Sequence, residues 1–206
     1  MHAAVVVAGG RSTRFGGADK AVASLAGTPM IRRVADRLAG PVGELVVNCR
    51  TDQRAPIEQA LIDYPRPVTY ALDDVPDEGP LPGMRAGLRA TDAPFAFVVG
   101  CDYPFVDPGF VRYLLDRAAA HDAAVPRPDA HPEALHAVYR VEPAVTACEG
   151  ALDRSERRAD AVLDGLDYAT VTGEEVEVHT VARTFENVNT RAAFEAAAER
   201  LTDGER

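Results

Sequence analysis

Short apolar runs alternate with helical patterns through the first half of the chain, and this alternation limits the folds that are open to it. The apolar runs predict strands at residues 5–8, 44–49, 68–72 and 94–100. Helical patterns follow them at 29–38, 56–62, 82–90 and 108–120. Strands and helices that alternate at these lengths build a parallel sheet with right-handed crossovers. We therefore expect an α/β fold, a doubly wound, mostly parallel sheet of Rossmann-like type with helices on both faces.

The second half of the chain is less regular. Strands are expected at 123–126, 134–141 and 184–188, and helices at 143–151, 157–163 and 192–201. Thr28 is a candidate N-cap for the helix at 29–38, and either Asn189 or Thr190 is a candidate N-cap for the last helix. Oxygens of threonine and asparagine side chains can accept hydrogen bonds from the free backbone N–H groups at a helix start. No linker, repeat or low-complexity tract divides the sequence, and 206 residues suit one domain of this class. We expect a single domain over residues 1–206.

The first predicted strand runs straight into a glycine-rich loop, G-G-R-S-T-R-F-G-G-A-D-K, at residues 9–20. A glycine-rich loop exposes backbone N–H groups and lets them approach phosphate oxygens closely. Lys20, the one lysine in the sequence, would add a compact positive charge, and Arg14 a planar guanidinium. The motif is neither a P-loop nor a dinucleotide fingerprint. The loop indicates a phosphate-binding site, and the alternative is a surface turn with scattered basic residues.

Two further motifs lie where the predicted strands end, which is where ligands bind in such sheets. Asp102 follows the most hydrophobic run, and its carboxylate could hold Mg²⁺ together with nucleotide phosphates. The alternative is an aspartate that starts the turn after the strand. The segment G-P-L-P-G at 79–83 begins a helix whose free N–H groups could meet an anion or a base edge. The alternative there is an ordinary strand-to-helix connection.

The amino-acid composition limits the binding partners and the cellular compartment that we expect for this protein. The formal net charge of −10 argues against a nucleic-acid or anionic-membrane partner. Acidity together with a single lysine suggests a halophilic source, while a GC-rich genome would explain the arginine but not the acidity. Three widely spaced cysteines fit a reducing compartment, and the N-terminal apolar run is too short for a signal peptide. We therefore expect a cytoplasmic protein, a monomer or a weak homo-oligomer.

Four motifs together resemble those of the molybdenum cofactor guanylyltransferases, which are nucleotidyltransferases with a nucleotide-diphospho-sugar transferase fold. The motifs are A-G-G-R-S-T-R-F-G-G-A-D-K, G-P-L-P-G, C-D-Y-P-F and N-V-N-T. Phe15 and Pro82 stand where methionine and alanine are usual in that family. The resemblance implies GTP as a substrate, Mg²⁺ as the cofactor, and molybdopterin or its molybdenum-bearing form as the acceptor.

The resemblance also implies roles for individual residues. Lys20 would contact the phosphates, Asn48 and Asp73 the guanosine, and Asp102 the magnesium ion. Because the segment between Leu72 and Gly79 is about one residue short, Asp74 could replace Asp73. The acceptor would be bound in the half spanning 107–206, by His131 in D-A-H-P and by Asn189 in N-V-N-T. The nucleotide would be bound in the half spanning 1–106 by Val7, Ala8, Gly9, Gly10, Lys20, Asn48, Asp73 and Asp102.

The expected reaction transfers GMP from GTP to the molybdopterin-type cofactor and releases pyrophosphate. Lys20, Arg14 and magnesium on Asp102 would neutralise the charge that builds on the transferred group. Three alternatives stay open. One is nucleotidyl transfer to a related small acceptor: cytidylyl transfer to molybdopterin, or guanylyl transfer to cobinamide phosphate or phospholactate. Another is a sugar-1-phosphate nucleotidyltransferase, and the third is a nucleotide-binding regulatory module without catalysis.

Overall fold

The computed structural model describes residues 1–10, 19–73 and 78–202. Arg14 and Asp74, two of the residues singled out from the sequence, lie outside these ranges. Within the described ranges, no helix combines the length and apolarity needed to cross a membrane.

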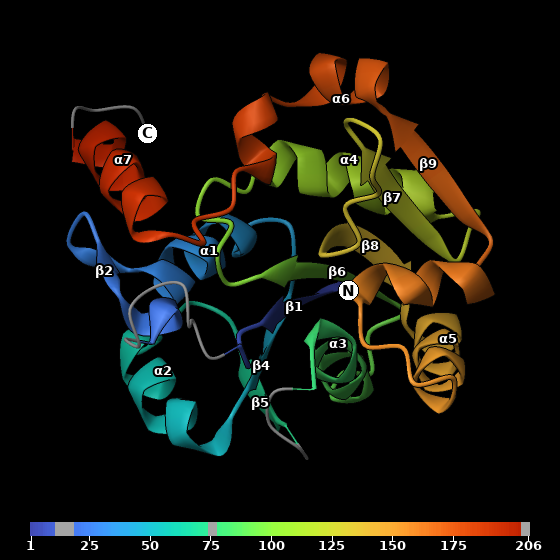
Figure 1. Cartoon of the computed structure of the whole chain (residues 1–206), viewed down its shortest axis with the longest axis horizontal. Coiled ribbons are helices and arrows are strands. Elements are labelled where there is room, and N and C mark those ends of the chain that lie inside the picture. The colour runs from blue at the N-terminus through green and yellow to red at the C-terminus, as the bar shows by residue number, and fades with distance from the viewer. Residues whose placement is uncertain (11–18, 74–77, 203–206) are drawn as a thin grey trace.

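A seven-stranded sheet forms the centre of the molecule (Figure 1). Six strands run in the same direction, and β8 runs antiparallel to both of its neighbours, β6 and β7. The mostly parallel sheet expected from the alternating pattern is therefore confirmed, with one reversed strand. In spatial order the strands are β5 (Val68–Leu72), β4 (Glu44–Cys49), β1 (Ala3–Val7), β6 (Phe95–Gly100), β8 (His136–Arg140), β7 (Ala123–Arg127) and β9 (Tyr168–Thr172).

Helices cover both faces of this sheet because its strands are apolar on both sides. In β1, Ala3 and Val5 pack into one apolar cluster, and Ala4 and Val6 pack into the other. The first cluster lies under α3 (Pro80–Arg89), α5 (Val141–Asp153) and the 3₁₀ helix η4 (Ala159–Gly165). In Figure 1, α1 and α4 lie above the sheet and α3 and α5 below it. The second cluster lies under α1 (Met30–Leu38), α2 (Arg54–Ala60), α4 (Pro108–Ala118) and α6 (Gly173–His179).

The C-terminal helix α7 (Arg191–Thr202) packs against a small N-terminal hairpin rather than against the sheet. The hairpin pairs β2 (Ser24–Leu25) with β3 (Thr28–Pro29). Five buried side chains join the hairpin, the segment before α4 and the C-terminal region in a third apolar cluster: Leu25, Met30, Phe105, Val188 and Ala197. This contact brings the end of the chain back to its beginning.

Of two predictions about helix caps, the one for α1 was wrong and the one for α7 is confirmed for Thr190. Thr28 does not cap α1, because it pairs with Leu25 in the hairpin and the helix begins only at Met30. Ala26 (φ +46°) and Gly27 (φ +80°) make the two-residue turn of that hairpin. At the other end of the chain, the Thr190 hydroxyl accepts from the Ala193 N–H at 3.1 Å, so Thr190 and not Asn189 provides the cap of α7.

The strand predicted at 184–188 is also absent. The segment contains the 3₁₀ helix η5 (Ala182–Phe185), and the buried Thr184 hydroxyl accepts from the backbone N–H of Asp107. The Val188 N–H donates to the Asp102 carbonyl instead of to a sheet neighbour. Conversely, β9 and α6 were not predicted, although Thr172 and Glu175 form a capping box that marks the start of α6.

The acidity of the chain leads to a prediction about salt. We expect the melting temperature to rise between low and molar potassium chloride, because carboxylates repel one another over a Debye length of about 30 Å at 0.01 M. Salt also weakens exposed ion pairs such as Arg54–Glu58 and Arg191–Glu195, which would lower the melting temperature. A rise in melting temperature would therefore show that screening of the repulsion between carboxylates is the larger effect. Thermal melts across a salt series provide the measurement. A flat or falling melting temperature would favour base composition as the origin of the arginine-rich, lysine-poor sequence.

Candidate nucleotide-binding site

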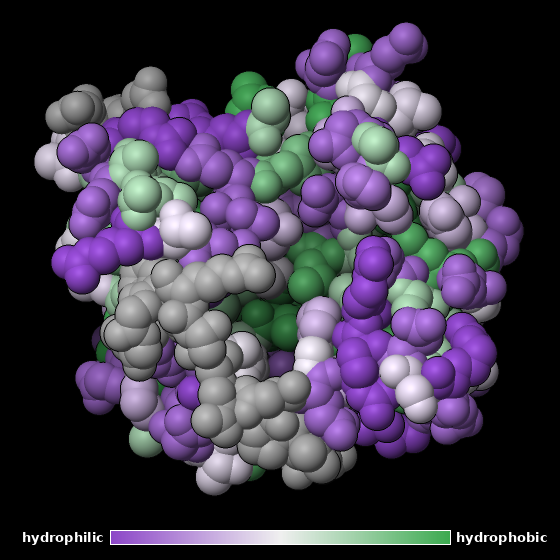
Figure 2. All heavy atoms as spheres, viewed as in Figure 1, coloured by the Kyte–Doolittle hydropathy of each residue, from purple (hydrophilic) through white to green (hydrophobic). Residues whose placement is uncertain are grey.

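A pocket of about 240 Å³ lies at the carboxyl ends of β1, β4 and β6. The chain moves outward from β1 to β4 on one side and returns to β6 on the other, which makes this the ligand-binding edge of a doubly wound sheet. Figure 2 shows a hollow with an apolar floor near the centre of this face. The pocket is lined by Val7, Ala8, Gly9, Gly10, Lys20, Asn48, Asp73, Glu78, Gly79, Pro80, Pro82, Gly100, Cys101, Asp102 and Leu135.

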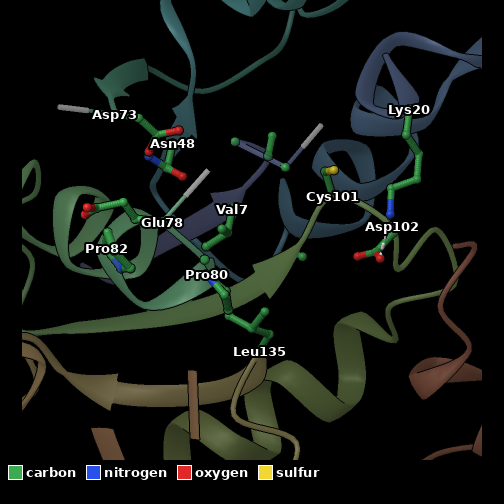
Figure 3. A pocket seen from close by; sticks show the side chains of 15 residues that line it. Val7, Lys20, Asn48, Asp73, Glu78, Pro80, Pro82, Cys101, Asp102 and Leu135 are labelled. Atoms are coloured by element: carbon green, nitrogen blue, oxygen red, sulfur yellow. Dashed lines mark hydrogen bonds and ion pairs between the residues drawn. The ribbon is translucent and has the colours of Figure 1, made fainter. Parts of the chain in front are cut away.

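All eight residues expected to bind the nucleotide line this one pocket. They come from five separate stretches of the sequence, and the parallel sheet brings these together at one edge. Figure 3 shows two groups of polar side chains. Asn48, Asp73 and Glu78 lie on one side of the pocket, and Lys20 and Asp102 lie on the other. We call these the carboxamide end and the lysine end.

Asn48 is the best-defined group of the carboxamide end. Its side chain is fully buried, and its Nδ2 donates to the Ala71 carbonyl at 3.2 Å and to Asp73 Oδ1 at 2.7 Å. Both partners accept, so the amide must present its nitrogen to them and its oxygen to the opposite side. This oxygen, Oδ1, is buried and has no hydrogen-bond partner among the described residues. An unpaired buried acceptor is costly, and a ligand N–H would satisfy it.

Glycine at two positions allows these side chains to lie where they do. A Cβ on Gly9 would overlap the Asp73 carboxylate, and a Cβ on Gly83 would overlap Asn48 Oδ1 and come within 3.3 Å of Val7 Cγ1. The strand end and the start of α3 can therefore approach the two polar side chains only without a side chain of their own.

Lys20 and Asp102 form the lysine end. Lys20 Nζ donates to Asp102 Oδ2 at 2.9 Å and to Asn189 Oδ1 at 2.5 Å. The side chains of Lys20 and Asp102 are only 13% and 15% exposed, so the ion pair is largely shielded from water. Lys20 is the first residue of a 3₁₀ helix, η2 (Lys20–Val22), and not a residue of an unsupported loop.

Asn189 lies far along the sequence but reaches the lysine end because the segment N-V-N lies beside C-D-Y. Val188 is buried in the third apolar cluster, and its N–H donates to the Asp102 carbonyl at 2.8 Å. The Asn189 side chain points toward Lys20, from which its Oδ1 accepts, and of the two cap candidates named from the sequence Thr190 is the one that caps the last helix.

Gln53 and Arg50 support the site and were not found from the sequence. Gln53, 1% exposed, donates from Nε2 to the Ala8 carbonyl at 3.0 Å and to Asp19 Oδ1 at 3.1 Å. Asp19 in turn accepts from the Ala21 N–H and caps the short helix that carries Lys20. The Arg50 guanidinium donates to the carbonyls of Gly9 and Gly10. Gln53 lies in the segment T-D-Q-R at residues 51–54, and Arg50 directly precedes this segment. The sequence here resembles that of an ordinary helix start, which is why neither residue was singled out.

His131 lies apart from the pocket. It is exposed on the connection between β7 and β8, where its backbone N–H donates to Asp129 Oδ1 at 2.9 Å, and it is not among the lining residues. Its role toward the acceptor stays a prediction.

Two buried cysteine thiols near the pocket have raised pKa values. Burial is the main cause that raises the pKa of Cys49 to about 11 and the pKa of Cys101 to about 12. Both groups are therefore neutral thiols near pH 7, whereas the thiolate is the nucleophilic form.

Asp102 suits a magnesium ion that arrives with phosphates. Mg²⁺ usually takes one or two protein carboxylates and completes its shell with phosphate oxygens and water. Within residues 1–10, 19–73 and 78–202, no group of three or more His, Cys, Asp or Glu side chains forms a protein-only site. The Lys20 ammonium already lies between Asp102 and Asn189 oxygens, so this position accepts a positive charge.

Comparison with known proteins agrees with this geometry. A family model described as a MobA-like NTP transferase domain matches residues 4–169. The chain belongs to this family. As a MobA-like NTP transferase, it is a nucleotidyltransferase, and the enzyme class expected from its motifs is confirmed.

Named relatives cover nearly the whole chain. A protein of Natronomonas pharaonis named probable molybdenum cofactor guanylyltransferase is 46% identical over 198 residues, 96% of this chain and 97% of the relative. A Haloferax mediterranei protein of the same name is 39% identical over 92% of this chain and 89% of its own length. The resemblance to the molybdenum cofactor guanylyltransferases is therefore confirmed at the level of the family.

Solved structures show the same fold. Molybdopterin-guanine dinucleotide biosynthesis protein A from Archaeoglobus fulgidus matches 98% of this MobA-like chain and 100% of its own, with a TM-score of 0.78 and 26% identity. 4-Diphosphocytidyl-2C-methyl-D-erythritol synthase from Anaerococcus prevotii has a TM-score of 0.74 at 12% identity, and that likeness supports the fold alone.

Proposed function

We propose that this MobA-like enzyme transfers GMP from GTP to a molybdopterin-type acceptor and releases pyrophosphate. The observation that carries the proposal is the division of one pocket into a carboxamide end suited to a base and a lysine end suited to phosphates. The names of the relatives supply the nucleotide and the acceptor.

The carboxamide end suits guanine. The Watson–Crick edge of guanine carries N1–H and N2–H₂ as donors. Asn48 Oδ1 lacks a donor among the described residues, and Asp73 keeps acceptor capacity on its carboxylate. A base whose donors meet these oxygens gains affinity, and a base that presents an acceptor there leaves buried oxygens unpaired.

In the proposed reaction, a phosphate oxygen of the acceptor attacks the α-phosphorus of GTP. The new P–O bond forms as the bond to the β-phosphate oxygen breaks, and that electron pair leaves with pyrophosphate. The attacking group is already an anion, so no general base is required. The role of the protein is to hold two anions in line and to neutralise the developing charge, for which Lys20 is placed.

Nucleotidyltransferases of this kind generally use a divalent metal, and we propose Mg²⁺ here. Asp102 would hold the ion together with phosphate oxygens and water. When bound, the ion supplies charge neutralisation at the phosphates. Asp102 also pairs with Lys20, and that pairing keeps both side chains at the lysine end.

We assign nucleotide binding to residues 1–106 and acceptor binding to residues 107–206. The bond from Lys20 to Asn189 crosses this boundary, so both halves contribute to the lysine end. We propose that Asn189 holds the ammonium group at the point where the acceptor phosphate meets the nucleotide. The proposed location is the cytoplasm.

GTP is expected to bind more tightly than CTP or ATP. Cytosine and adenine each present one amino donor beside a ring-nitrogen acceptor, so neither base can donate to Asn48 Oδ1 and to the Asp73 carboxylate at the same time. Isothermal titration of each nucleotide with magnesium measures the preference. ITP serves as the matched control, because it lacks only the 2-amino group. Tighter binding of CTP would move the assignment to a cytidylyltransferase.

Pyrophosphate release tests the reaction itself. GTP, CTP and ATP would each be combined with molybdopterin, its molybdenum form, cobinamide phosphate and phospholactate. Release that depends on GTP and on a molybdopterin-type acceptor supports the proposed function. Release with another acceptor, or nucleotide binding without any release, would overturn it in favour of one of the alternatives.

A further inference from the structure

One short segment after β4 contacts both ends of the glycine-rich sequence described above. Where that sequence begins, Arg50 Nη1 donates to the carbonyls of Gly9 and Gly10 at 3.0 and 2.9 Å. Where it ends, Gln53 Nε2 donates to Asp19 Oδ1 at 3.1 Å. Neither Arg50 nor Gln53 is among the pocket-lining residues, so any effect on a ligand passes through the groups that they hold.

Arg50 and Gln53 are fixed relative to each other by two reciprocal hydrogen bonds. The Arg50 N–H donates to Gln53 Oε1 at 3.0 Å, and the Gln53 N–H donates to the Arg50 carbonyl at 3.1 Å. These bonds close the single turn of the 3₁₀ helix η3 (Thr51–Gln53), which leads directly into α2. Reciprocal bonds of this kind hold a helix start in one conformation, so the two side chains extend from a rigid support.

The Arg50 guanidinium has a fixed orientation. Its Nε and Nη2 donate to the two carboxylate oxygens of Asp52 at 3.0 and 3.1 Å, which is a bidentate pair. The third nitrogen, Nη1, is the one that meets the two glycine carbonyls. In a trans peptide the carbonyl and the N–H point in opposite directions, and the described residues contain no cis peptide. Because the Gly9 carbonyl points to Arg50, the Gly10 N–H points away from it.

The Gln53 amide joins the end of β1 to the short helix that carries Lys20. Its Nε2 donates to the Ala8 carbonyl as well as to Asp19 Oδ1. The same Asp19 oxygen accepts from the Ala21 N–H at 3.0 Å and caps η2, of which Lys20 is the first residue. Gln53 is 1% exposed, so these bonds are shielded from water.

We propose that Arg50 and Gln53 are positioning residues for the phosphates of the bound nucleotide. Arg50 turns the Gly10 N–H toward the pocket, and Gln53 holds the Lys20 ammonium at a set distance from it; both Gly10 and Lys20 line the pocket. Donors that are held in place before the ligand arrives need no reorganisation when they meet phosphate oxygens. The inference rests on the proposed function only in taking the ligand to be a nucleoside triphosphate.

Guanosine and GTP separate the two ends of the pocket, because guanosine lacks the phosphates that the lysine end would hold. Arg50→Met is expected to weaken the binding of GTP with magnesium about tenfold and to leave guanosine binding unchanged, since the bonds that orient the peptide donors are lost. Competition against a fluorescent GTP analogue measures both affinities. Unchanged GTP affinity in the folded variant would overturn the inference, and so would an equal loss for guanosine and GTP.

Two control variants remove comparable bonds elsewhere. Arg66 also donates to a backbone carbonyl, at 2.9 Å on an exposed surface, and Arg66→Met is the matched control for Arg50→Met. The Tyr64 hydroxyl donates to a buried carbonyl at 3.0 Å, so Tyr64→Phe is the control for Gln53→Met. Neither control residue lines the pocket, and both variants should bind guanosine and GTP as the wild type does. A loss of GTP affinity in a control as large as in its partner would overturn the inference.

A double-mutant cycle tests the path from Gln53 to Lys20. Gln53→Met is expected to weaken GTP binding several-fold, and most of that effect should disappear when Lys20 is already alanine. Arg50→Met should keep its full effect in the same background, because the orientation of the Gly10 N–H does not depend on Lys20. Additive losses for Gln53→Met and Lys20→Ala would overturn the role of Gln53. If Gln53→Met does not fold, Arg50→Met still decides the inference.

Failure of this inference can be told apart from failure of the proposed function. If CTP binds more tightly than GTP, the guanylyl assignment is wrong, and the same comparison is made with cytidine and CTP. A loss confined to the triphosphate would then support the positioning roles without guanine. If GTP-dependent transfer proceeds and every folded variant binds GTP as the wild type does, only the positioning roles are wrong.

Discussion

Lys20→Ala is expected to lower turnover by about 10²-fold or more, the size of loss seen when one preorganised charge-stabilising donor is removed. The ammonium group lies between Asp102 and Asn189 at the end of the pocket assigned to the phosphates. Removing it leaves developing negative charge without its nearest side-chain cation among the described pocket residues. Turnover is measured as pyrophosphate release at saturating GTP and acceptor.

Three companion variants separate charge from position. Lys20→Arg keeps the charge but changes its shape, and should recover only part of the rate. Asn189→Ala keeps the ammonium group and removes one of its anchors, so a smaller loss of about tenfold is expected. Arg54→Ala removes a cation from an exposed pair on α2 and should leave turnover unchanged. A Lys20→Ala enzyme with near-normal turnover would refute the phosphate role.

Asp102→Ala is expected to abolish the magnesium-dependent part of GTP binding while the protein stays folded. The carboxylate is the one acidic group beside Lys20 in the described pocket lining. Its backbone carbonyl, which accepts from the Val188 N–H, is kept in the variant, so the C-terminal segment should remain docked. Titration of GTP with and without magnesium measures the loss, and a thermal melt checks the fold.

Asp102→Asn is the closer control for shape, because it removes the charge and keeps the side-chain outline. It should behave like Asp102→Ala toward magnesium. GTP binding measured without magnesium should change little in either variant, since Lys20 keeps its bond to Asn189. If magnesium enhanced GTP binding equally in the wild type and in both variants, the assignment of the metal to Asp102 would be wrong.

The first half of the fold could be predicted because its pattern is local. Strands β4 and β5 begin and end at the predicted residues, since each is a short, largely apolar run bounded by polar or turn residues. The hairpin before α1 was missed because the turn at Ala26 and Gly27 is flanked by strands of only two residues. In the second half, β9 is short, with Tyr168 and Thr170 partly exposed, and its apolar signal is weak.

The candidate site, like the fold, could be predicted only in part. Eight of the residues that line the pocket were named from the motifs and the family resemblance, and they lie at or near the ends of strands. Their mutual contacts were not predictable, because the bond from Lys20 to Asn189 spans 169 positions and no local pattern fixes such a register. Gln53 illustrates the same limit, since only the folded chain shows that its amide joins the Ala8 carbonyl to Asp19.

The N-V-N segment beside C-D-Y has a consequence for protein synthesis. All but one of the pocket-lining residues lie at or before position 102, and they are synthesised well before residue 189. Asn189, the last anchor of Lys20, follows Val188 of the third apolar cluster, which also contains Ala197. The lysine end therefore can be completed only near the end of synthesis.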